Sequence, residues 1–300
     1  MPLDPILARL GLDGSDAPAL APPVDLDERR AAADAGLLLA HTGPEPGVTK
    51  QDRVIAGVPV REYLPDDTHD PSSTFLYFHG GGWFQGNLDT AEVEMGPMAS
   101  LAGCRVVSVQ YRLAPEHPFP AALDDCVAVY EALVAEGGKI AVGGTSAGAN
   151  LAAALCLAVR DRGLPQPVLQ LLDAPCLDLT FGSASIEEFR GDPLERQLEE
   201  FAGFYASDRA DRLVSPLLAE DLSGLAPAVI TVAELDPVRD DGERYLTRLH
   251  AAGVPGTCVR VQAMFHIGWV VPFTVAFRLV NDLRAAALRR AFDGTLLPFG

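Results

Sequence analysis

Short apolar runs bounded by turn-forming residues recur along the chain, and segments with apolar residues at helical spacing lie between them. The strand-like runs cover 53–64, 74–79, 105–111, 140–143, 168–172, 228–233 and 258–261. The helical segments cover 28–39, 92–102, 121–136, 147–160, 242–252 and about 273–292. This alternation predicts an α/β fold, in which a mostly parallel sheet carries helices on both faces.

The alternation breaks between residues 176 and 227, which hold helical sequence but no convincing strand. Fifty residues without regular structure are improbable inside a compact domain. We therefore interpret this interval as an insertion that packs over one end of the sheet, together with the N-terminal helix. One more crossover helix with long loops is the alternative.

The net charge of the chain disfavours several classes of binding partner. The 300-residue chain carries 23 basic and 41 acidic residues, which gives a net charge of −18. Such a surplus repels phosphate backbones and anionic lipid surfaces, so we expect neither nucleic-acid nor membrane binding. The longest purely apolar run, residues 151–159, is far shorter than the ~20 residues that span a bilayer. The N-terminal sequence shows no signal-peptide pattern, which favours the cytoplasm.

The cysteines and histidines show no pattern of a disulfide framework or a metal site. The five cysteines are widely spaced, odd in number and form no CxxC motif. This distribution is typical of reduced thiols that pack as small apolar side chains. The six histidines form neither HxxxH nor HExxH, so we expect no metal and no cofactor.

The strongest chemical signal is GTSAG (144–148), which matches the G-x-S-x-G pattern between a strand-like run and a helical segment. A sharp strand-to-helix turn holds a nucleophilic serine in a strained backbone and exposes its oxygen. The helix N-terminus then directs amide groups toward developing negative charge. We predict Ser146 as a nucleophile. A glycine-rich turn in which Ser146 only caps the helix is the alternative.

A second signal is HGGGW (79–83), at the end of an apolar run. Three consecutive glycines are entropically costly, and they are explained if backbone amides must turn toward a ligand. We predict that the amides of Gly81, Gly82 and Ala147 form an oxyanion hole. A plain loop is the alternative, whereas no Gly-Lys-Ser/Thr follows that would indicate a phosphate-binding loop. His79 is expected to hold the glycine loop rather than act as a base.

A serine nucleophile needs a base, and the base needs an orienting acid. In this architecture the acid and then the histidine follow the serine along the chain. His250 and His266 are the two histidines after Ser146. His250 lies in a helical segment, whereas His266 follows a strand in a loop that could return to Ser146. We therefore predict His266 as the base.

The acid should stand at the carboxyl end of the strand-like run 228–233. Asp236 lies there, 90 residues after Ser146 and 30 residues before His266. Glu234 still belongs to the strand, and Asp240 and Asp241 resemble charges of a first helical turn. We predict Asp236 as the acid.

Taken together, the motifs of this chain resemble those of the hormone-sensitive-lipase-like, or bacterial family IV, carboxylesterases of the α/β-hydrolase superfamily. The resemblance rests on HGGGW (79–83), YRLAPEHPFPAALDD (111–125), GTSAGAN (144–150), SPLLAEDLSGLAPA (215–228) and AELDPVRDDGERY (233–245). It covers residues 50–270. Position by position, it matches Ser146, Asp236 and His266 to the family's triad and the three amides named above to its oxyanion hole.

The resemblance also implies an organisation into three parts. These are an N-terminal cap segment (1–50), an α/β-hydrolase catalytic domain (51–176 and 216–300) and a cap insertion (177–215). The chain is short for the family, so a small helical cap is expected.

Two motifs depart from the commoner family pattern. The elbow is usually GDSAGG, whereas Thr145 and Ala149 stand here, as in a GTSAG-type branch. The base is usually followed by Gly-Phe, whereas Ile267, Gly268 and Trp269 follow His266. The additional residue is expected to shift the loop or to reshape the pocket wall.

The resemblance implies a serine carboxylesterase that hydrolyses short-to-medium acyl esters through an acyl-enzyme, and the net charge favours neutral esters. The alternatives are a deacetylase or dehydratase of secondary metabolites and a non-catalytic receptor on the same fold; the presence of His266 argues against the receptor. Aromatic residues that could line the pocket or belong to the core are Trp83, Phe84, Tyr205 and Trp269. Relatives often pair as dimers through edge strands or through the late helices, so a homodimer is a further expectation.

Overall fold

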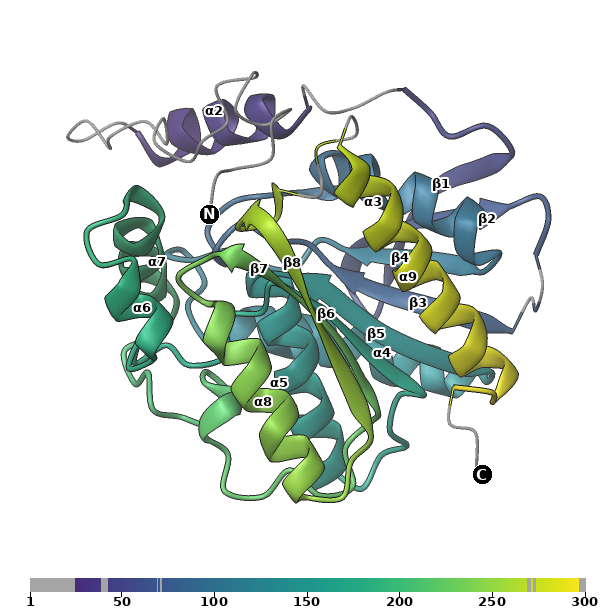
Figure 1. Cartoon of the computed structure of the whole chain (residues 1–300). Coiled ribbons are helices and arrows are strands. Elements are labelled where there is room, and N and C mark those ends of the chain that lie inside the picture. Colours follow the sequence, from purple (N-terminus) through teal and green to yellow (C-terminus); the bar gives the residue numbers. More distant parts are fainter. Residues whose placement is uncertain are drawn as a thin grey trace.

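A single eight-stranded sheet forms the centre of the molecule (Figure 1), in the order β1-β2-β4-β3-β5-β6-β7-β8. The computed structural model describes residues 25–38, 43–68, 70, 72–268, 271 and 274–296. All neighbouring strands from β4 to β8 pair in parallel, and β1 and β2 join antiparallel at one edge. The predicted mostly parallel sheet is confirmed. The strands are β1 (Val48–Ile55), β2 (Val58–Pro65), β3 (Ser73–Phe78), β4 (Arg105–Val109), β5 (Lys139–Thr145), β6 (Leu169–Asp173), β7 (Ala228–Leu235) and β8 (Gly256–Phe265).

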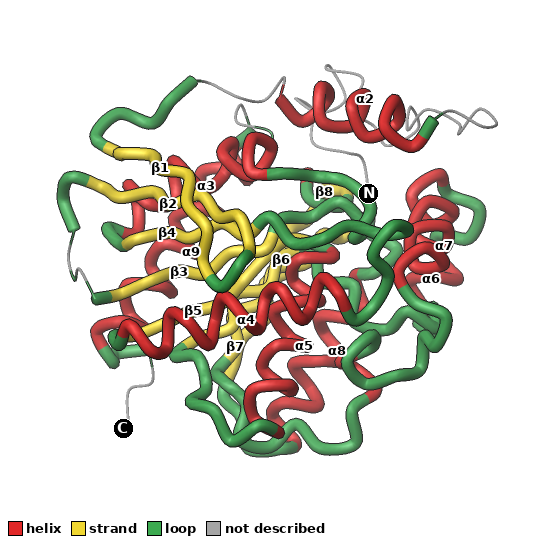
Figure 2. The backbone as a smooth tube through the Cα atoms, turned by 180° about the vertical axis from the view of Figure 1, so that it is seen from behind, coloured by secondary structure: helices red, strands yellow, loops and turns green. Residues whose placement is uncertain are grey.

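Helices cover both faces of the sheet, as the alternation predicts. Helices α3 (Leu88–Ala102) and α9 (Val275–Asp293) pack together on one face and share an apolar core with β3, β4 and β6. Helices α4 (Ala121–Glu136), α5 (Ala147–Asp161) and α8 (Arg239–Ala251) lie on the other face, around the larger core cluster. Figure 2, seen from behind, shows α4 and α5 in front of the strands. The central strands β3, β4, β5, β6 and β7 are therefore buried on both sides, whereas the edge strands β1 and β8 are largely exposed.

The first strand-like run, 53–64, is two strands rather than one. β1 and β2 form a hairpin in which Ile55 pairs with Val58, so the turn consists of Ala56 and Gly57. Both turn residues have positive φ, 51° and 85°, the conformation that a two-residue hairpin turn requires. Alanine is a weak signal for such a turn, which explains why the sequence reads as a continuous strand.

Helix α3 begins four residues before the predicted start at 92. Asn87 is its N-cap: its side chain accepts hydrogen bonds from the amides of Asp89 and Thr90, and the Thr90 hydroxyl accepts from the Asn87 amide. This capping box satisfies amides that the helix itself cannot pair. The Asn-x-x-Thr pattern at 87–90 is the sequence feature that marks this helix start.

Residues 176–227 contain helices and no strand, as expected. Helices α6 (Ala184–Glu188) and α7 (Pro193–Tyr205) and the short 3-10 helix η1 (Pro216–Leu218) lie in this interval. Helix α2 (Leu26–Leu38) comes close to α7, because Arg29 forms a bidentate ion pair with Glu200 at 2.6–2.8 Å. Figures 1 and 2 both show α2 and α7 beyond the same end of the sheet, and the arrows of β7 and β8 in Figure 1 point toward that end. Most of the predicted N-terminal cap segment, residues 1–24 and 39–42, lies outside the described residues.

Candidate active site

Three side chains from the carboxyl ends of three parallel strands meet in one hydrogen-bonded chain. Nε2 of His266 lies 2.9 Å from Oγ of Ser146, and Nδ1 of His266 lies 2.7 Å from Oδ2 of Asp236. Ser146 follows β5, Asp236 follows β7 and His266 follows β8. The carboxyl ends of parallel strands share one edge of a sheet, which brings residues 120 positions apart into contact. The structure thus unites the three residues predicted from the sequence.

Burial sets the electrostatics of this chain of groups. Asp236 is fully buried, and Ser146 and His266 are 6% and 8% exposed. Oδ1 of Asp236 accepts the Val238 amide at 3.0 Å, which fixes the carboxylate while Oδ2 faces the imidazole. Since all three side chains are buried, each of these hydrogen bonds is stronger than it would be in bulk solvent.

The turn that carries Ser146 is strained, as the G-x-S-x-G pattern predicts. Ser146 adopts φ 56° and ψ −114°, a conformation that L-residues rarely populate. Its amide donates to the Asp173 carbonyl at 2.8 Å, and its carbonyl accepts the Asn150 amide at 3.1 Å. These two bonds hold the strained residue between β6 and the first turn of α5.

The two glycines of the turn are required by close packing. A Cβ at Gly148 would lie 1.9 Å from the Phe78 carbonyl oxygen, and one at Gly144 would lie 2.4 Å from the same atom. Both contacts involve backbone, which cannot move aside as a flexible side chain can. The elbow therefore presses against the end of β3, where the glycine loop begins.

The glycine loop 80–82 lies beside the elbow. A Cβ at Gly80 would meet the Thr145 carbonyl at 3.0 Å. Gly81 and Gly82 have φ of 115° and 62°, and a Cβ at Gly82 would lie 2.1 Å from the Phe201 ring of α7. The Gly81 carbonyl accepts the amides of Phe84 and Gln85, while the amides of Gly81 and Gly82 donate to no acceptor in the described part of the chain. The Ala147 amide belongs to the first residue of α5, where helical pairing is absent.

His79 anchors this loop. Its ring stacks on Tyr111 with centroids 4.2 Å apart, and its Nδ1 lies 2.8 Å from the Gly80 carbonyl. Burial lowers the pKa of His79 to about 4, so the ring is neutral at physiological pH. It does not contact Ser146, in agreement with the structural role expected for it.

The other carboxylates near Asp236 have partners elsewhere. Glu234 accepts the Ala263 amide at 2.7 Å across an irregularity between β7 and β8. Asp240 accepts the Ser185 amide, and Asp241 accepts the amides of Leu177 and Asp178. None of these three carboxylates reaches His266.

Asp241 gives a testable dependence of stability on pH. Burial, followed by the nearby Asp178 carboxylate, raises the pKa of Asp241 to about 8 against the opposing effect of the Leu177 amide. Between pH 4 and 8 the folded state thus holds a proton that the unfolded state has lost, so the free energy of unfolding falls as pH rises. We expect Asp241→Asn, which cannot ionise, to gain roughly 2 kcal/mol or more relative to wild type between pH 5 and pH 8. Urea unfolding at several pH values measures this, and parallel curves for the two proteins would refute it.

The predicted aromatic pocket residues are buried among themselves. Trp83 stacks on Tyr205 at 4.4 Å between centroids, and Phe84 stacks on Phe201 at 4.9 Å. The guanidinium of Arg29 lies over both Phe84 and Phe201. These contacts join the glycine loop to α2 and α7. Trp269 lies outside the described residues.

The chain turns sharply directly after His266. Ile267 adopts φ 51°, and a Cβ at Gly268 would lie 2.5 Å from Sδ of Met264. His266 makes both of its hydrogen bonds beside this left-handed turn. The Ile267 side chain lines a cavity beside the site.

That cavity has a volume of about 160 Å³ and borders all three parts of the site. Gly80 and Gly81 belong to the glycine loop, Thr145 precedes Ser146, and Ile267 follows His266. Leu37 of α2 completes the wall on the side of the N-terminal helix. The side chains at its other end come from β3 and α3, and no sequence motif marks them.

Comparison with known proteins agrees with the fold. Residues 75–270 match the family model described as alpha/beta hydrolase fold. The carboxylesterase NlhH of Mycobacterium tuberculosis is 38% identical, over 86% of this chain and 88% of its own length. The carboxylic ester hydrolase LipN of the same organism is 41% identical over 71% of this chain, but the match spans only 62% of LipN. A solved esterase of the bacterial hormone-sensitive lipase family superimposes with a TM-score of 0.89 at 29% identity, covering 97% of this chain and all of that one.

Fold and site together define an α/β-hydrolase, and the relatives define its chemistry as the hydrolysis of carboxylic esters. The chain belongs to the hormone-sensitive-lipase family (family IV) of carboxylesterases. Ester substrates follow from this membership.

Two further observations concern the classes of partner considered above. No helix in the described ranges is both long and apolar enough to cross a membrane. Within the same ranges, His, Cys, Asp and Glu side chains form no group of three that could bind a metal ion.

Proposed function

We propose that Ser146 is the nucleophile of this carboxylesterase, His266 its general base and acid, and Asp236 the group that orients the imidazole. Asp236 holds the proton on Nδ1, which leaves Nε2 free to accept the proton of Ser146 as its oxygen attacks the ester carbon. The resulting imidazolium then protonates the leaving alcohol. Water, activated by the same Nε2, hydrolyses the acyl-enzyme. The observation that carries this proposal is the 2.9 Å and 2.7 Å hydrogen-bonded chain through His266.

The amides of Gly81, Gly82 and Ala147 are the proposed oxyanion hole. Two of them belong to the glycine run 80–82 beside the elbow, and the third begins α5, whose positive dipole end faces the same place. Gly82 and Gly80 lie so close to Phe201 and Thr145 that a side chain at either position would meet them, and this close packing restricts movement of the loop. Rigid donors need no reorganisation when negative charge develops on the substrate oxygen.

Covalent labelling tests the assignment of the nucleophile. An alkyl fluorophosphonate is expected to add one phosphonyl group per chain and to abolish ester hydrolysis in parallel, because an activated serine attacks phosphorus as it attacks a carbonyl. Peptide mass spectrometry should place the label on Ser146. A label on another serine, or inactivation without any label, would contradict the proposal.

We also propose that the N-terminal segment (1–50) and residues 177–215 form a small cap over the catalytic domain (51–176 and 216–300). The support comes from the contacts of α2 with α7 and with the segment that follows the glycine loop: Arg29 pairs with Glu200, and Arg30 donates to the Phe84 carbonyl at 2.8 Å. Substitution of Arg30 by alanine should change KM more than kcat if the cap shapes the substrate pocket. Unchanged KM would argue against this role.

The preferred substrates are proposed to be neutral esters with short-to-medium acyl groups. The net charge of −18 disfavours anionic substrates, and the cavity of about 160 Å³ matches a group of benzene-like size. A series of esters from acetate to decanoate, together with a carboxylated ester of matched length, tests both statements. Faster turnover of the carboxylated ester or of decanoate would contradict them.

A cytoplasmic homodimer is the proposed state of the protein. The five cysteines are free thiols and four of them are buried, as suits a reducing compartment. The edge strands β1 and β8 carry the exposed apolar side chains Val54 and Val259, which favours edge pairing. Sedimentation equilibrium and cell fractionation test the two statements separately.

A further inference from the structure

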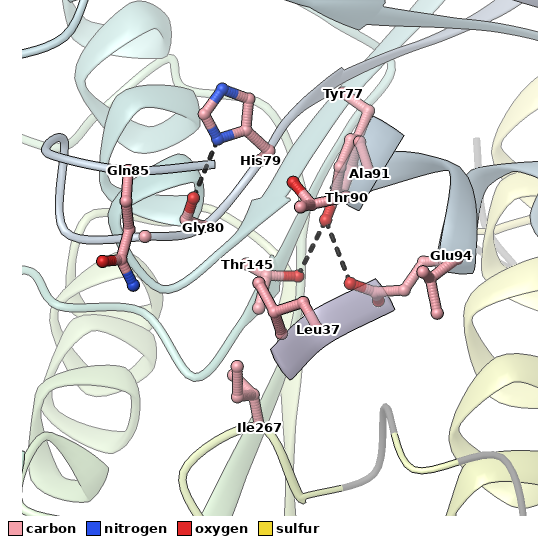
Figure 3. Close-up of a pocket in the computed structure, with 12 residues that line it drawn as sticks. Leu37, Tyr77, His79, Gly80, Gln85, Thr90, Ala91, Glu94, Thr145 and Ile267 are labelled. Carbon is pink, nitrogen blue, oxygen red and sulfur yellow. Dashed lines mark hydrogen bonds between the residues drawn. The ribbon is translucent and has the colours of Figure 1, made fainter. Parts of the chain in front are cut away.

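The cavity beside the triad ends at a buried polar cluster that the mechanism does not use. Figure 3 shows Glu94 and Tyr77 at one side of the cavity, with the hydroxyl of Tyr77 joined to both Glu94 and Thr145. Tyr77 donates to Oε1 of Glu94 at 3.2 Å, and its oxygen lies 3.2 Å from Oγ1 of Thr145. Because the single phenolic proton goes to Glu94, the Thr145 hydroxyl is the donor to Tyr77. A chain of hydrogen bonds thus runs from Thr145, the residue before Ser146, through Tyr77 to the Glu94 carboxylate.

The charges in this cluster do not balance. Arg284 of α9 donates to Oε2 of Glu94 at 2.8 Å, and its Nε lies 2.9 Å from Oδ2 of Asp173. Arg284 and Asp173 are each 1% exposed. Burial raises the pKa of Asp173 to about 6, which still leaves it ionised at neutral pH. One guanidinium therefore faces two carboxylates, and the excess negative charge lies next to the cavity.

The Glu94 carboxylate also has hydrogen-bonding capacity left. Its side chain is 11% exposed and lines the cavity, whereas two carboxylate oxygens can accept about four hydrogen bonds in all. Tyr77 and Arg284 use one lone pair on each oxygen. A donor entering the cavity would meet a charged acceptor in surroundings of low dielectric, where such a bond is strong.

We propose that this cavity is the acyl subsite of the esterase and that Glu94 selects short acyl groups bearing a hydroxyl donor. The inference rests on the proposed role of Ser146. The cavity borders Gly81 of the proposed oxyanion hole and Thr145, the residue before Ser146, and it meets the buried Tyr77 at its other side. This position suits the acyl group that stays on the serine rather than the alcohol that must leave. The cavity volume of about 160 Å³ can hold a group of roughly the size of benzene. A four-carbon acyl group with one hydroxyl substituent therefore fits. The apolar walls contributed by Leu37, Ala91 and Ile267 cover the rest of such a group.

A pair of isosteric esters tests the proposal. Ethyl 3-hydroxybutanoate and ethyl 3-methylbutanoate differ only by hydroxyl against methyl, and in competition their rates give the ratio of kcat/KM directly. For the better enantiomer of the hydroxy ester we expect a preference of about 10-fold, because a hydrogen bond to a charged group exceeds the loss of hydration. Glu94→Gln, which keeps the shape but removes the charge, should reduce this preference to about 2-fold.

Glu92→Gln is the matched control. Glu92 lies on the same helix, pairs with Lys50 and Arg61 and does not line the cavity, so this variant should keep the full preference. The preference is a ratio within one preparation, so it does not depend on how much of a variant is folded. The pair 3-hydroxybutyl acetate and 3-methylbutyl acetate places the same groups on the alcohol side, where no preference is expected.

Three results would overturn the inference: a wild-type preference for the methyl ester, equal effects of the Glu92 and Glu94 substitutions, or a hydroxyl preference on the alcohol side alone. These results would leave the proposed function intact, since esters would still be hydrolysed. Absence of hydrolysis of every ester, together with absence of fluorophosphonate labelling at Ser146, would refute both.

Discussion

Substitution of Ser146 by alanine is expected to lower kcat for a short p-nitrophenyl ester by about 10⁶-fold. The hydroxyl lies 2.9 Å from Nε2 of His266 and is the group that would form the covalent intermediate. Without it, the remaining His266 and Asp236 have no nucleophile to activate. Stabilisation of the oxyanion alone leaves about 10³-fold to 10⁴-fold acceleration over water. The variant should also lose all labelling by the fluorophosphonate.

Ser108→Ala is the control for this measurement. Ser108 is a fully buried serine on β4, and its hydroxyl has no hydrogen-bond partner in the described part of the chain. Its substitution should leave kcat and labelling within about 3-fold of wild type, since isolated changes of this size are small. Turnover of Ser146→Ala within 100-fold of wild type, in protein with an unchanged circular-dichroism spectrum, would eliminate Ser146 as the nucleophile.

The residues at the reacting centre could be located from the sequence because each belongs to a short local pattern. GTSAG lies between a strand and a helix, HGGG ends a strand, and Asp236 and His266 each follow a strand. In a parallel sheet all of these positions fall at the same edge, so the order of elements along the chain is enough to bring them together.

The cluster around Glu94 could not be located in this way. Tyr77, Glu94, Asp173 and Arg284 come from β3, α3, β6 and α9, and no two of them are close in the sequence. Glu94 lies on α3 together with Asp89 and Glu92, and carboxylates on a helix are typical of a solvated face. Its burial depends on how α3 and α9 pack against one face of the sheet, which is a tertiary property.

The same distinction holds for the contacts of α2. Arg29 and Arg30 stand among charged and small residues that predict a helix but do not indicate which groups these two side chains contact. In the structure no residue of α2 is buried, yet both guanidinium groups lie over the Phe84 ring, and they pair with Glu200 and Glu116. Long side chains of this kind cover apolar surface while their charged ends find partners, and their partners are not visible from the helix alone.

Asp236→Asn is expected to lower kcat by about 10⁴-fold while leaving the fold intact. Oδ2 of Asp236 accepts from Nδ1 of His266 at 2.7 Å, and Oδ1 accepts the Val238 amide. An asparagine keeps its oxygen on the Val238 amide and presents its NH₂ group to the imidazole. His266 must then accept at Nδ1, which places its proton on Nε2, facing Ser146. The base becomes a donor where an acceptor is needed, and no charge remains to stabilise the imidazolium.

Asp240→Asn separates this effect from a general loss of acidic charge near the site. Asp240 lies four residues further on, accepts the Ser185 amide and does not reach His266, so its substitution should change kcat by less than about 3-fold. Labelling by the fluorophosphonate should slow in proportion to kcat in Asp236→Asn, because both reactions need the same activated oxygen. If Asp236→Asn retained more than a tenth of wild-type activity, the orienting acid would have to be sought elsewhere. Equal losses in the two variants would instead indicate that the site responds to net charge and not to the tautomer of His266.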